Sequence, residues 1–578
     1  MKRIFAYMKP RWLILVLVLF LKLAAAMLEL QIPSALADII DVGIPAAREA
    51  GNLSPLTQYG LAMGGFALAA FITNLTANIV SAQMNNKVTA HIRQDLFHKI
   101  FHLSARQIDQ VTIPSAVSRL TSDTYNINAM FNRCLRMGVR APILMIGGIA
   151  VTLFMDPVLT LTLVVALPLI VVLVLRLTRK AMPLFRQRQT ILDDMVRTVQ
   201  ESASGIRVIK ALSKTEYEKG RFDKVNGDLA DKRMEASLVM SKTRPVSSIV
   251  LNFSLVCVVV LGALRVNGGV MLPGRIIAFI NYFPIILNAT LGISGIFMVL
   301  TNGLASAQRV SQVLEMPEDM TLADILPDQS DAAVEFRDVS FSYKGVENNI
   351  SHLSFSLRKG QTLGIIGGTG SGKSTITNLL LRFYDPDEGQ ILLNGRDLRS
   401  IPNDELRRMF GVTFQNDFLM ADTIEKNISF FRDLDPGEVR KAAVLAQAAE
   451  FIDQRDGGMD AMLTIRGNNL SGGQKQRLLI ARALAGNPEI LILDDASSAL
   501  DYRTDADLRK ALSESCPDTT KIVVAQRVSS IRNADLILVM EGGEVIGHGT
   551  HEELMVSCPT YQEIAQIQME SEEVEVHA

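Results

Sequence analysis

The residues best suited to chemistry form a glycine-rich run between an apolar stretch and a stretch with helical spacing. The run is Gly367-Gly368-Thr369-Gly370-Ser371-Gly372-Lys373-Ser374-Thr375, and it follows the apolar residues 362–366. A strand, a glycine loop and a helix in this order are the context of a P-loop. Its backbone N–H groups turn toward the α- and β-phosphates of a nucleotide, Lys373 reaches the β- and γ-phosphates, and the Ser374 hydroxyl ligates Mg²⁺. The alternative, a glycine turn with an incidental lysine, is disfavoured by the flanking patterns.

A carboxylate that suits Mg²⁺ follows farther along the chain. The apolar run Ile490-Leu491-Ile492-Leu493 predicts a buried strand, and this strand ends in Asp494, followed by Asp495. A strand that ends in an aspartate can deliver this side chain to the metal beside a P-loop. Between the two features lies Leu470-Ser471-Gly472-Gly473-Gln474, which opens a helical stretch. On its own, this segment predicts only an ordinary helix cap.

The composition is typical of a chain that is partly embedded in a membrane. The chain has 578 residues, of which 48% are hydrophobic, and this length predicts at least two domains. With 58 Lys and Arg against 60 Asp and Glu, the basic excess that favours phosphate-backbone binding is missing, so we expect no nucleic acid partner. The four cysteines have no paired spacing, which indicates neither a disulfide framework nor a zinc site.

Six apolar runs in the first half are long enough to cross a hydrocarbon core of roughly 30 Å. We predict spans at about 12–32, 58–81, 137–155, 158–176, 246–266 and 276–300, with a break at Asp156-Pro157. Lys and Arg gather before the first span, between the second and third, and between the fourth and fifth. Because cytoplasmic flanks carry such residues, we expect a multi-pass protein of the plasma (inner) membrane with both termini in the cytoplasm. The two long basic connections are predicted to continue the helices.

The first apolar run leaves two questions open. A cleavable signal peptide that ends near Ala24-Ala25-Ala26 is the alternative to a retained helix, but the run continues to Pro33 without a clear stop. Lys22 and Glu29 share one helical face, which suits a helix that faces a bundle interior or a cavity. Either substrate contact or structural pairing would explain these two charges.

Taken together, these features resemble a half-transporter of the ATP-binding cassette (ABC) exporter superfamily, and the resemblance covers nearly the whole chain. Residues 470–474 match the family's signature motif, and Ser498-Ala499-Leu500-Asp501 matches its D-loop. Gln415 matches the Q-loop glutamine, and Tyr343 matches the aromatic residue that stacks on adenine. The resemblance implies a six-helix all-α transmembrane domain (1–310), a linker (311–332) and an α/β P-loop nucleotide-binding domain with a helical subdomain (333–565). An acidic tail (566–578) would follow.

The resemblance also implies ATP and Mg²⁺ as cofactors. Mg²⁺ would be held by Ser374, Gln415 and Asp494, with Gln415 serving catalysis as well. Two nucleotide domains of the family pair head to tail, so that one P-loop faces Ser471, Gly473 and Gln474 of the other chain. Segments 118–123 and 205–210 resemble the regions whose coupling helices press on those domains; a solvated helix surface is the alternative.

Three positions depart from the family pattern. Asp495 stands where the family has the glutamate that polarises the attacking water, and its side chain is one methylene shorter. Gln526 replaces a histidine; its amide can donate a hydrogen bond to the γ-phosphate but cannot become cationic. Ile465 replaces an acidic residue of many exporters. Full activity with Asp495 and Gln526 is the alternative to an impaired site.

These departures predict a division of labour between two different chains. This chain's own site would bind ATP and hydrolyse it slowly, while its signature motif would complete a competent site with a non-identical second half-transporter. The expected function is export of amphipathic or hydrophobic compounds across the lipid bilayer, as in heterodimeric bacterial multidrug exporters. Export of a specific lipid, peptide or thiol metabolite and an ATP-sensing regulatory subunit are the alternatives. A soluble DNA-repair ATPase would share the nucleotide motifs but not the six spans.

Overall fold

The computed structural model describes residues 2–317, 320–345, 348–415 and 417–577. The side chains of residues 2, 294–295, 297–298 and 569–577 lie outside this description, and with them most of the predicted acidic tail. Contacts group the chain into two units. The transmembrane unit comprises Met1–Phe101 and Pro114–Met316, and the nucleotide unit comprises His102–Ile113 and Pro317–Ala578.

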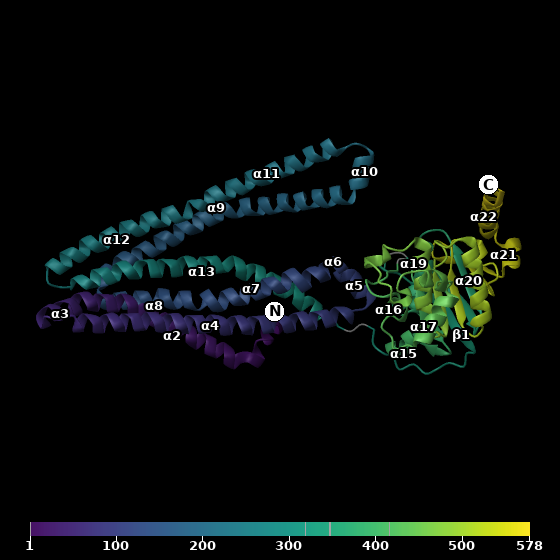
Figure 1. Ribbon diagram of the computed structural model, residues 1–578, viewed down its shortest axis with the longest axis horizontal. Coiled ribbons are helices and arrows are strands. Elements are labelled where there is room, and N and C mark those ends of the chain that lie inside the picture. The colour runs from purple at the N-terminus through teal and green to yellow at the C-terminus, as the bar shows by residue number, and fades with distance from the viewer. Residues whose placement is uncertain (1, 318–319, 346–347, 416, 578) are drawn as a thin grey trace. The chain divides into compact units, whose positions relative to one another are not determined.

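Six helices among the described residues are long and apolar enough to cross a membrane, which confirms the six predicted spans. The main helices are α2 (Trp12–Asp38), α4 (Ser54–Phe101), α8 (Arg140–Met155), α9 (Pro157–Ser204), α12 (Thr243–Asn267) and α13 (Pro273–Leu314). Shorter elements connect or extend them: α1 (Lys2–Ala6), α3 (Ile44–Ala50), α6 (Ile113–Ser118), α7 (Thr124–Arg133), α10 (Ile206–Ala211) and α11 (Thr215–Ser241). The long basic connections are helical, as predicted, and α9 and α11 run side by side (Figure 1).

Polar caps and close packing fix the ends and crossings of these helices. The predicted break is confirmed, because Asp156 caps α9 by accepting hydrogen bonds from the N–H groups of Val158 (2.9 Å) and Leu159 (3.1 Å). Pro157 suits the first turn, where its missing N–H is not needed. Between α8 and α13, a Cβ at Gly148 would lie 2.7 Å from Ile286, so only glycine permits this approach.

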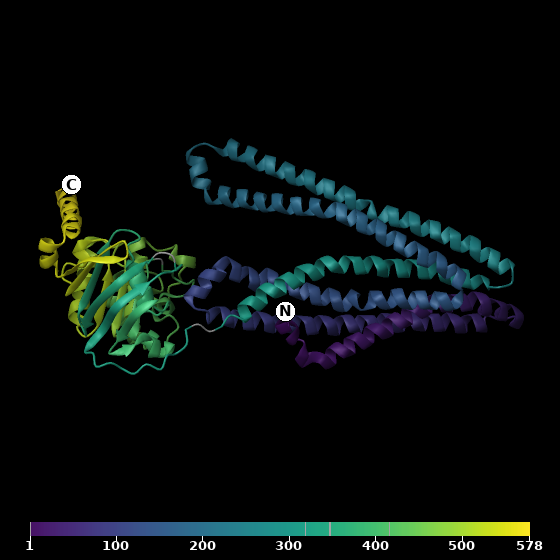
Figure 2. The same cartoon turned by 180° about the vertical axis from the view of Figure 1, so that it is seen from behind.

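The nucleotide unit is built on two sheets, whose strands are seen well in Figure 2. The first has the order β2-β1-β4-β5, with β1 (Ala332–Phe341), β2 (Ile350–Arg358), β4 (Glu388–Leu393) and β5 (Arg396–Asp397). The second has the order β10-β9-β3-β8-β7-β6, with β3 (Thr362–Gly367), β6 (Phe410–Thr413), β7 (Ile490–Asp494), β8 (Thr520–Val524), β9 (Leu536–Glu541) and β10 (Glu544–Gly549). Five neighbouring strands of this sheet run parallel to one another: β9, β3, β8, β7 and β6. The edge strand β10 is antiparallel to β9.

Helices complete this unit and confirm the predicted α/β domain with a helical subdomain. The helices that accompany the sheets are α14 (Lys373–Leu380), α15 (Asn403–Met409), α20 (Tyr502–Ser515), α21 (His551–Ser557) and α22 (Pro559–His577). The helical subdomain contains α16 (Ile424–Ser429), α17 (Pro436–Leu445), α18 (Ala449–Asp453) and α19 (Gly472–Leu484), which share one apolar core. Helix α22 extends through much of the predicted tail.

A short helix from the first half of the chain belongs to the nucleotide unit. This helix, α5 (Ala105–Val111), begins with a capping box in which Ser104 and Gln107 bond each other's backbone N–H groups. The Tyr384 hydroxyl donates a hydrogen bond to Asp109 (2.5 Å), and the Arg106 guanidinium lies 3.7 Å from the Asp387 carboxylate. The coupling role expected of 118–123 stays a prediction. Those residues extend α6 into the π-helical turn η3 (Arg119–Asp123), where Asp123 pairs with Arg309 inside the transmembrane unit. The second predicted segment does form a short helix, α10.

The Tyr384–Asp109 hydrogen bond predicts a measurable weakening of α5 docking. We expect Tyr384→Phe to destabilise the docked helix by about 1 kcal/mol, because a neutral donor to a partly exposed carboxylate is lost. Amide hydrogen exchange of residues 105–111 should then speed up several-fold. Tyr561→Phe removes a hydroxyl that lies 2.9 Å from His551 in the same unit and serves as the control. Equal exchange of α5 in both variants would show that this hydrogen bond does not hold the helix.

Candidate functional site

The parallel strands bring four separate sequence segments to one edge of the sheet. Val524 of β8 pairs with Asp494 of β7 and with Ile365 of β3, and Thr413 of β6 pairs with Leu493. Because these strands are parallel, their carboxyl ends meet at the same edge, where ligands bind in open α/β sheets. The P-loop, Gln415, the Asp494-Asp495 pair and Gln526 therefore converge there, although more than 150 residues separate the first from the last.

The glycine loop has the backbone conformation that a phosphate cradle requires. Gly370 and Gly372 have φ angles of +82° and +98°, a region that side-chain-bearing residues rarely adopt. A Cβ at Gly372 would also lie 2.7 Å from the carbonyl oxygen of Asn349. The hydroxyl of Ser371 is buried without a hydrogen-bond partner, although its side chain lies inside this loop. A loop of this shape with an unsatisfied hydroxyl fits the phosphates of a nucleotide.

The cation of the loop is held close to the backbone. Lys373 donates hydrogen bonds to the carbonyl oxygens of Gly367 (2.9 Å) and Gly368 (2.7 Å). Burial lowers the pKa of its ammonium group, and the carboxylates of Asp494 and Asp495 oppose this shift. An ammonium that lacks an ion-pair partner among the described residues is ready to exchange these carbonyls for phosphate oxygens.

The predicted metal ligands also lie together. Asp494 ends β7 with 4% of its surface exposed, and burial raises the pKa of its carboxyl group. Ser374, at the start of α14, forms a hydrogen bond with this carboxylate. An oxygen donor set of a buried carboxylate and a hydroxyl beside a phosphate cradle fits Mg²⁺. The Gln415 side chain forms a hydrogen bond with the carboxylate of the adjacent Asp495.

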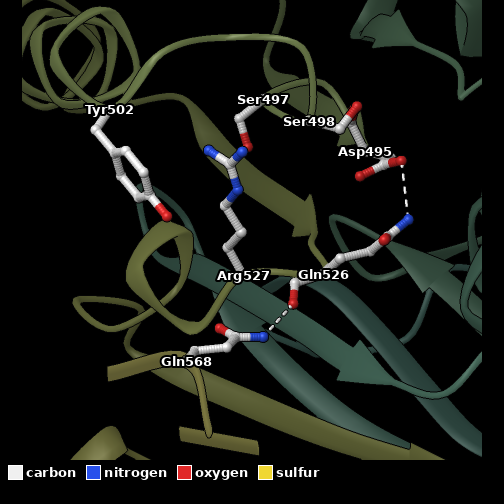
Figure 3. A pocket seen from close by; sticks show the side chains of 7 residues that line it. All are labelled: Asp495, Ser497, Ser498, Tyr502, Gln526, Arg527 and Gln568. Atoms are coloured by element: carbon white, nitrogen blue, oxygen red, sulfur yellow. Dashed lines mark hydrogen bonds between the residues drawn. The ribbon is translucent and has the colours of Figure 1, made fainter. Parts of the chain in front are cut away.

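The two residues that depart from the family pattern contact each other (Figure 3). The Gln526 side-chain amide donates a hydrogen bond of 3.1 Å to the Asp495 carboxylate. Burial raises the pKa of Asp495, while hydrogen bonds from Ser498 and Gln415 partly offset the rise. Asp495 also has a φ of +55°, a left-handed conformation that aspartate tolerates better than most residues. The pair replaces a longer carboxylate and a titratable imidazole with a shorter carboxylate and a neutral amide.

The structure adds a residue that the sequence did not reveal. Gln568 of α22 donates a hydrogen bond to the backbone oxygen of Gln526 (2.8 Å) and accepts one from the N–H of Val528 (2.7 Å). Figure 3 shows Gln568 below Gln526, which begins the switch segment (residues 526–528). Gln568 lines a cavity of about 340 Å³ together with Asp495 and Tyr502. No local motif could have identified Gln568, because its partners lie some forty residues earlier in the chain.

These two hydrogen bonds predict that Gln568 positions Gln526. We expect Gln568→Ala to lower kcat for hydrolysis of the ATP bound at this chain's own site, measured in single turnovers, about three- to tenfold and to change its affinity for ATP less than about twofold, because Gln526 loses alignment while the P-loop stays intact. Gln562→Ala is the matched control, since the side chain of Gln562 in the same helix donates a hydrogen bond to the backbone oxygen of Met555. A fall in thermal stability with unchanged kcat would assign Gln568 a purely structural role.

The signature residues form the capped N-terminus of α19, which is exposed to solvent. Ser471 caps α19 through a capping box, accepting from the Gln474 N–H (3.3 Å), while Gln474 accepts from the Ser471 N–H (3.0 Å). Gly473 faces the D-loop, because a Cβ there would lie 3.2 Å from the oxygen of Ala499. Over the described residues, no hydrogen bond links Ser471 to this chain's own P-loop. These residues remain available to another chain.

The predicted adenine-stacking residue lies near the loop in an aromatic cluster. Tyr343 contacts Phe341 and Tyr384 with ring centroids 4.9 Å and 5.0 Å away. Its hydroxyl lies 3.4 Å from the Thr375 hydroxyl, directly after the P-loop lysine and serine. The structure thus places Tyr343 and Thr375 together on the P-loop side of the first sheet. Thr369 lies in the glycine loop itself.

Comparisons with known proteins agree with this architecture. Residues 15–290 match the ABC transporter transmembrane region family, and residues 350–498 match the ABC transporter family. The chain is 34% identical over 572 residues to the ABC transporter ATP-binding protein YfiB of Bacillus subtilis, covering 98% of both chains. It is 30% identical over 495 residues to the ATP-dependent lipid A-core flippase of Vibrio parahaemolyticus, covering 84% of each.

A solved structure of a bacterial Atm1-family ABC exporter with ATP bound has the same fold. It superimposes with a TM-score of 0.78 at 24% identity, over 97% of this chain and 99% of that chain. ATP binding and ATP-driven transport follow from the matches to the two family models, together with the P-loop and the signature segment. The chain therefore belongs to the ABC transporter family, as an exporter-type half-transporter with one transmembrane domain fused to one nucleotide-binding domain.

Proposed function

We propose that this chain is one half of a heterodimeric exporter of amphipathic or hydrophobic compounds, of the multidrug type, in the plasma (inner) membrane. The observation that carries the proposal is the hydrogen bond between Gln526 and Asp495 at the carboxyl edge of the sheet. It joins the two positions at which the family has its catalytic histidine and glutamate. The basic connections support cytoplasmic placement of both termini and of the nucleotide unit.

The site is built to bind ATP better than to hydrolyse it. Lys373 and the glycine loop hold the phosphates, and Ser374, Gln415 and Asp494 hold Mg²⁺, which supplies charge neutralisation when bound. The side chain of Asp495 is one methylene too short to reach where a glutamate would orient water, and a misplacement on the order of 1 Å costs about a hundredfold in rate. Gln526 contributes a neutral hydrogen bond in place of a charge-assisted one.

An intact signature motif gives this chain a second task. Ser471 and Gly473 start α19 at the surface, and a helix N-terminus with free N–H groups attracts phosphate. A partner with the usual glutamate and histidine would obtain one competent site from this segment. A homodimer would instead contain two slow sites. The retained ATP would keep the nucleotide domains associated while the partner's site drives switching.

Apolar surfaces support coupling to a partner chain. Ile465 is 71% exposed and borders a cavity of about 700 Å³ with Phe418, Met420 and Phe431. At the tip between α9 and α11, helix α10 exposes Val208 and has no buried residue. We propose that Ile465 replaces the usual acidic contact with an apolar one to a coupling segment of the partner.

The mass of the complex tests this function. The complex is extracted gently from its native membrane, weighed intact, and its subunits are then separated and weighed. Two unequal subunits are the expected result. A single subunit mass would overturn the heterodimer and leave either turnover with Asp495 and Gln526 or ATP sensing as the explanation.

A lipid substrate is the second candidate, because one relative is a lipid A-core flippase. Export of a peptide or thiol metabolite and an ATP-sensing role remain further candidates for the same chain. Stimulation of ATP hydrolysis by the transported compound would separate transport from sensing.

A further inference from the structure

A buried cation in the transmembrane unit has only neutral hydrogen-bond partners. Lys22 of α2 is 1% exposed, and its ammonium group donates to the side-chain oxygens of Asn74 (2.9 Å) and Asn78 (2.7 Å) of α4. Within the described ranges, Lys22 forms no salt bridge. A charge inside a bilayer is costly and is normally paired with an opposite charge, so two amide oxygens are an unusual environment.

Two arginines strengthen the positive charge at this point. Arg136 lies in the π-helical turn η4 (Cys134–Gly138) and donates to the same Asn78 oxygen at 3.3 Å. Arg140, one turn further, pairs with Glu29 at 2.7 Å and 2.5 Å, while its Nε is buried without a partner. Both guanidinium groups act electrostatically on Lys22. Over the described residues, Arg140 is thus the one of these three cations that forms a salt bridge, with Glu29.

Unsatisfied polar groups extend along the same face of α4. Asn74, Asn78, Ser81 and Asn85 follow one another at spacings of four, three and four residues, which places them in one helical row. Ser81 and Asn85 are at most 1% exposed, and neither side chain has a hydrogen-bond partner. Buried polar groups in folded proteins are nearly always paired, so these atoms are available to a guest molecule.

The cationic cluster lies in an apolar part of the chain. Lys22 belongs to α2, which lies within one of the six helices that are long and apolar enough to cross a membrane. The exposed Phe20, Leu23 and Met27 lie on a different face of α2 from Lys22 and add to its apolar surface. An anion bound at the three cations would lie between apolar helices, which favours an anionic group that carries a hydrocarbon part over a free inorganic anion.

We propose that Lys22, Arg136 and Arg140 bind the phosphate or carboxylate group of an anionic amphiphile, which defines the class of exported substrate. The proposal rests on the exporter function proposed above and narrows it to anionic amphiphiles. Asn74 and Asn78 orient Lys22, and Glu29 holds Arg140, whose buried Nε has no partner among the described residues. The anion neutralises the excess positive charge, which favours its binding over that of a cationic or uncharged amphiphile.

Equilibrium binding without ATP tests the site separately from transport. The complete complex in phosphatidylcholine nanodiscs is incubated with radiolabelled dodecyl phosphate, and unlabelled dodecyl phosphate, dodecyltrimethylammonium and inorganic phosphate serve as competitors. Only dodecyl phosphate should displace the label efficiently. We expect Arg136→Gln to weaken binding about tenfold, whereas Arg136→Lys should retain most of it.

Arg133→Gln is the matched control, because Arg133 ends the preceding helix α7 and loses the same charge three residues away. It should leave affinity within about twofold of the parent. Lys22→Met is measured alongside thermal unfolding, so that loss of folding is separated from loss of binding. Equal competition by dodecyltrimethylammonium or by inorganic phosphate, or equal affinities of Arg136→Gln and Arg133→Gln, would overturn the proposal. Intact binding without ATP-dependent transport would overturn the exporter function and leave the binding site standing.

Discussion

Replacing Lys373 by alanine is expected to weaken ATP binding at this chain's P-loop by two to three orders of magnitude. The ammonium group is the cation of the glycine loop, and it is held by carbonyl oxygens that phosphate oxygens can replace. Removing one partner of a buried, hydrogen-bonded charge pair costs about 2–5 kcal/mol. Fluorescent ATP analogue titration of the purified complex measures the loss, with photo-crosslinking to assign the label to this chain.

Lys359→Ala provides the control for this experiment. Lys359 is exposed in the turn after β2, and its replacement by alanine removes the same charge from the same unit. It should leave the affinity unchanged within about twofold. If Lys373→Ala and Lys359→Ala bound ATP equally well, the assignment of Lys373 to the phosphates would be wrong.

The second large effect is a gain of activity. Asp495→Glu combined with Gln526→His is expected to raise the rate of ATP hydrolysis at this chain's own site about tenfold to a hundredfold. The side chain at position 495 becomes one methylene longer, and the imidazole at position 526 can carry a positive charge. Single-turnover hydrolysis and the lifetime of bound nucleotide measure this change. Bound ATP should leave the complex faster in the double variant.

Two controls separate this gain from effects at the partner's site. Each single substitution should give a smaller increase, since both residues act on the same bond to the γ-phosphate. Adding Lys373→Ala should abolish the gain, because the site then binds no ATP. Unchanged turnover together with unchanged nucleotide retention would contradict the slow-site interpretation.

The nucleotide half shows how much a local pattern can reveal. The apolar runs before Gly367 and Asp494 predicted two strands, and both are present as β3 and β7. The six spans were predictable because a bilayer requires long uninterrupted apolar helices. The capping box of Ser104 and Gln107 is a local pattern that indicates a helix start, whereas the packing of α5 within the nucleotide unit depends on contacts with distant residues.

Contacts between distant segments were beyond prediction from sequence. The Asp495–Gln526 hydrogen bond, the grip of Gln568 on the switch segment and the Lys22 cluster each join residues at least 31 positions apart. Which residues meet in such pairs depends on strand order and on helix crossings. A linear pattern does not contain this information.

By itself, the sequence determined the number of spans, the P-loop and the residue types in the nucleotide site, because each depends on local periodicity or on spacing along a few turns of chain. The tertiary structure decided that the parallel strand order brings Asp495 and Gln526 within hydrogen-bond distance. It also decided that α4 and the π-helical turn before α8 surround Lys22 with amides and arginines. Packing in three dimensions sets these neighbours, since the energy of a charge depends on what surrounds it.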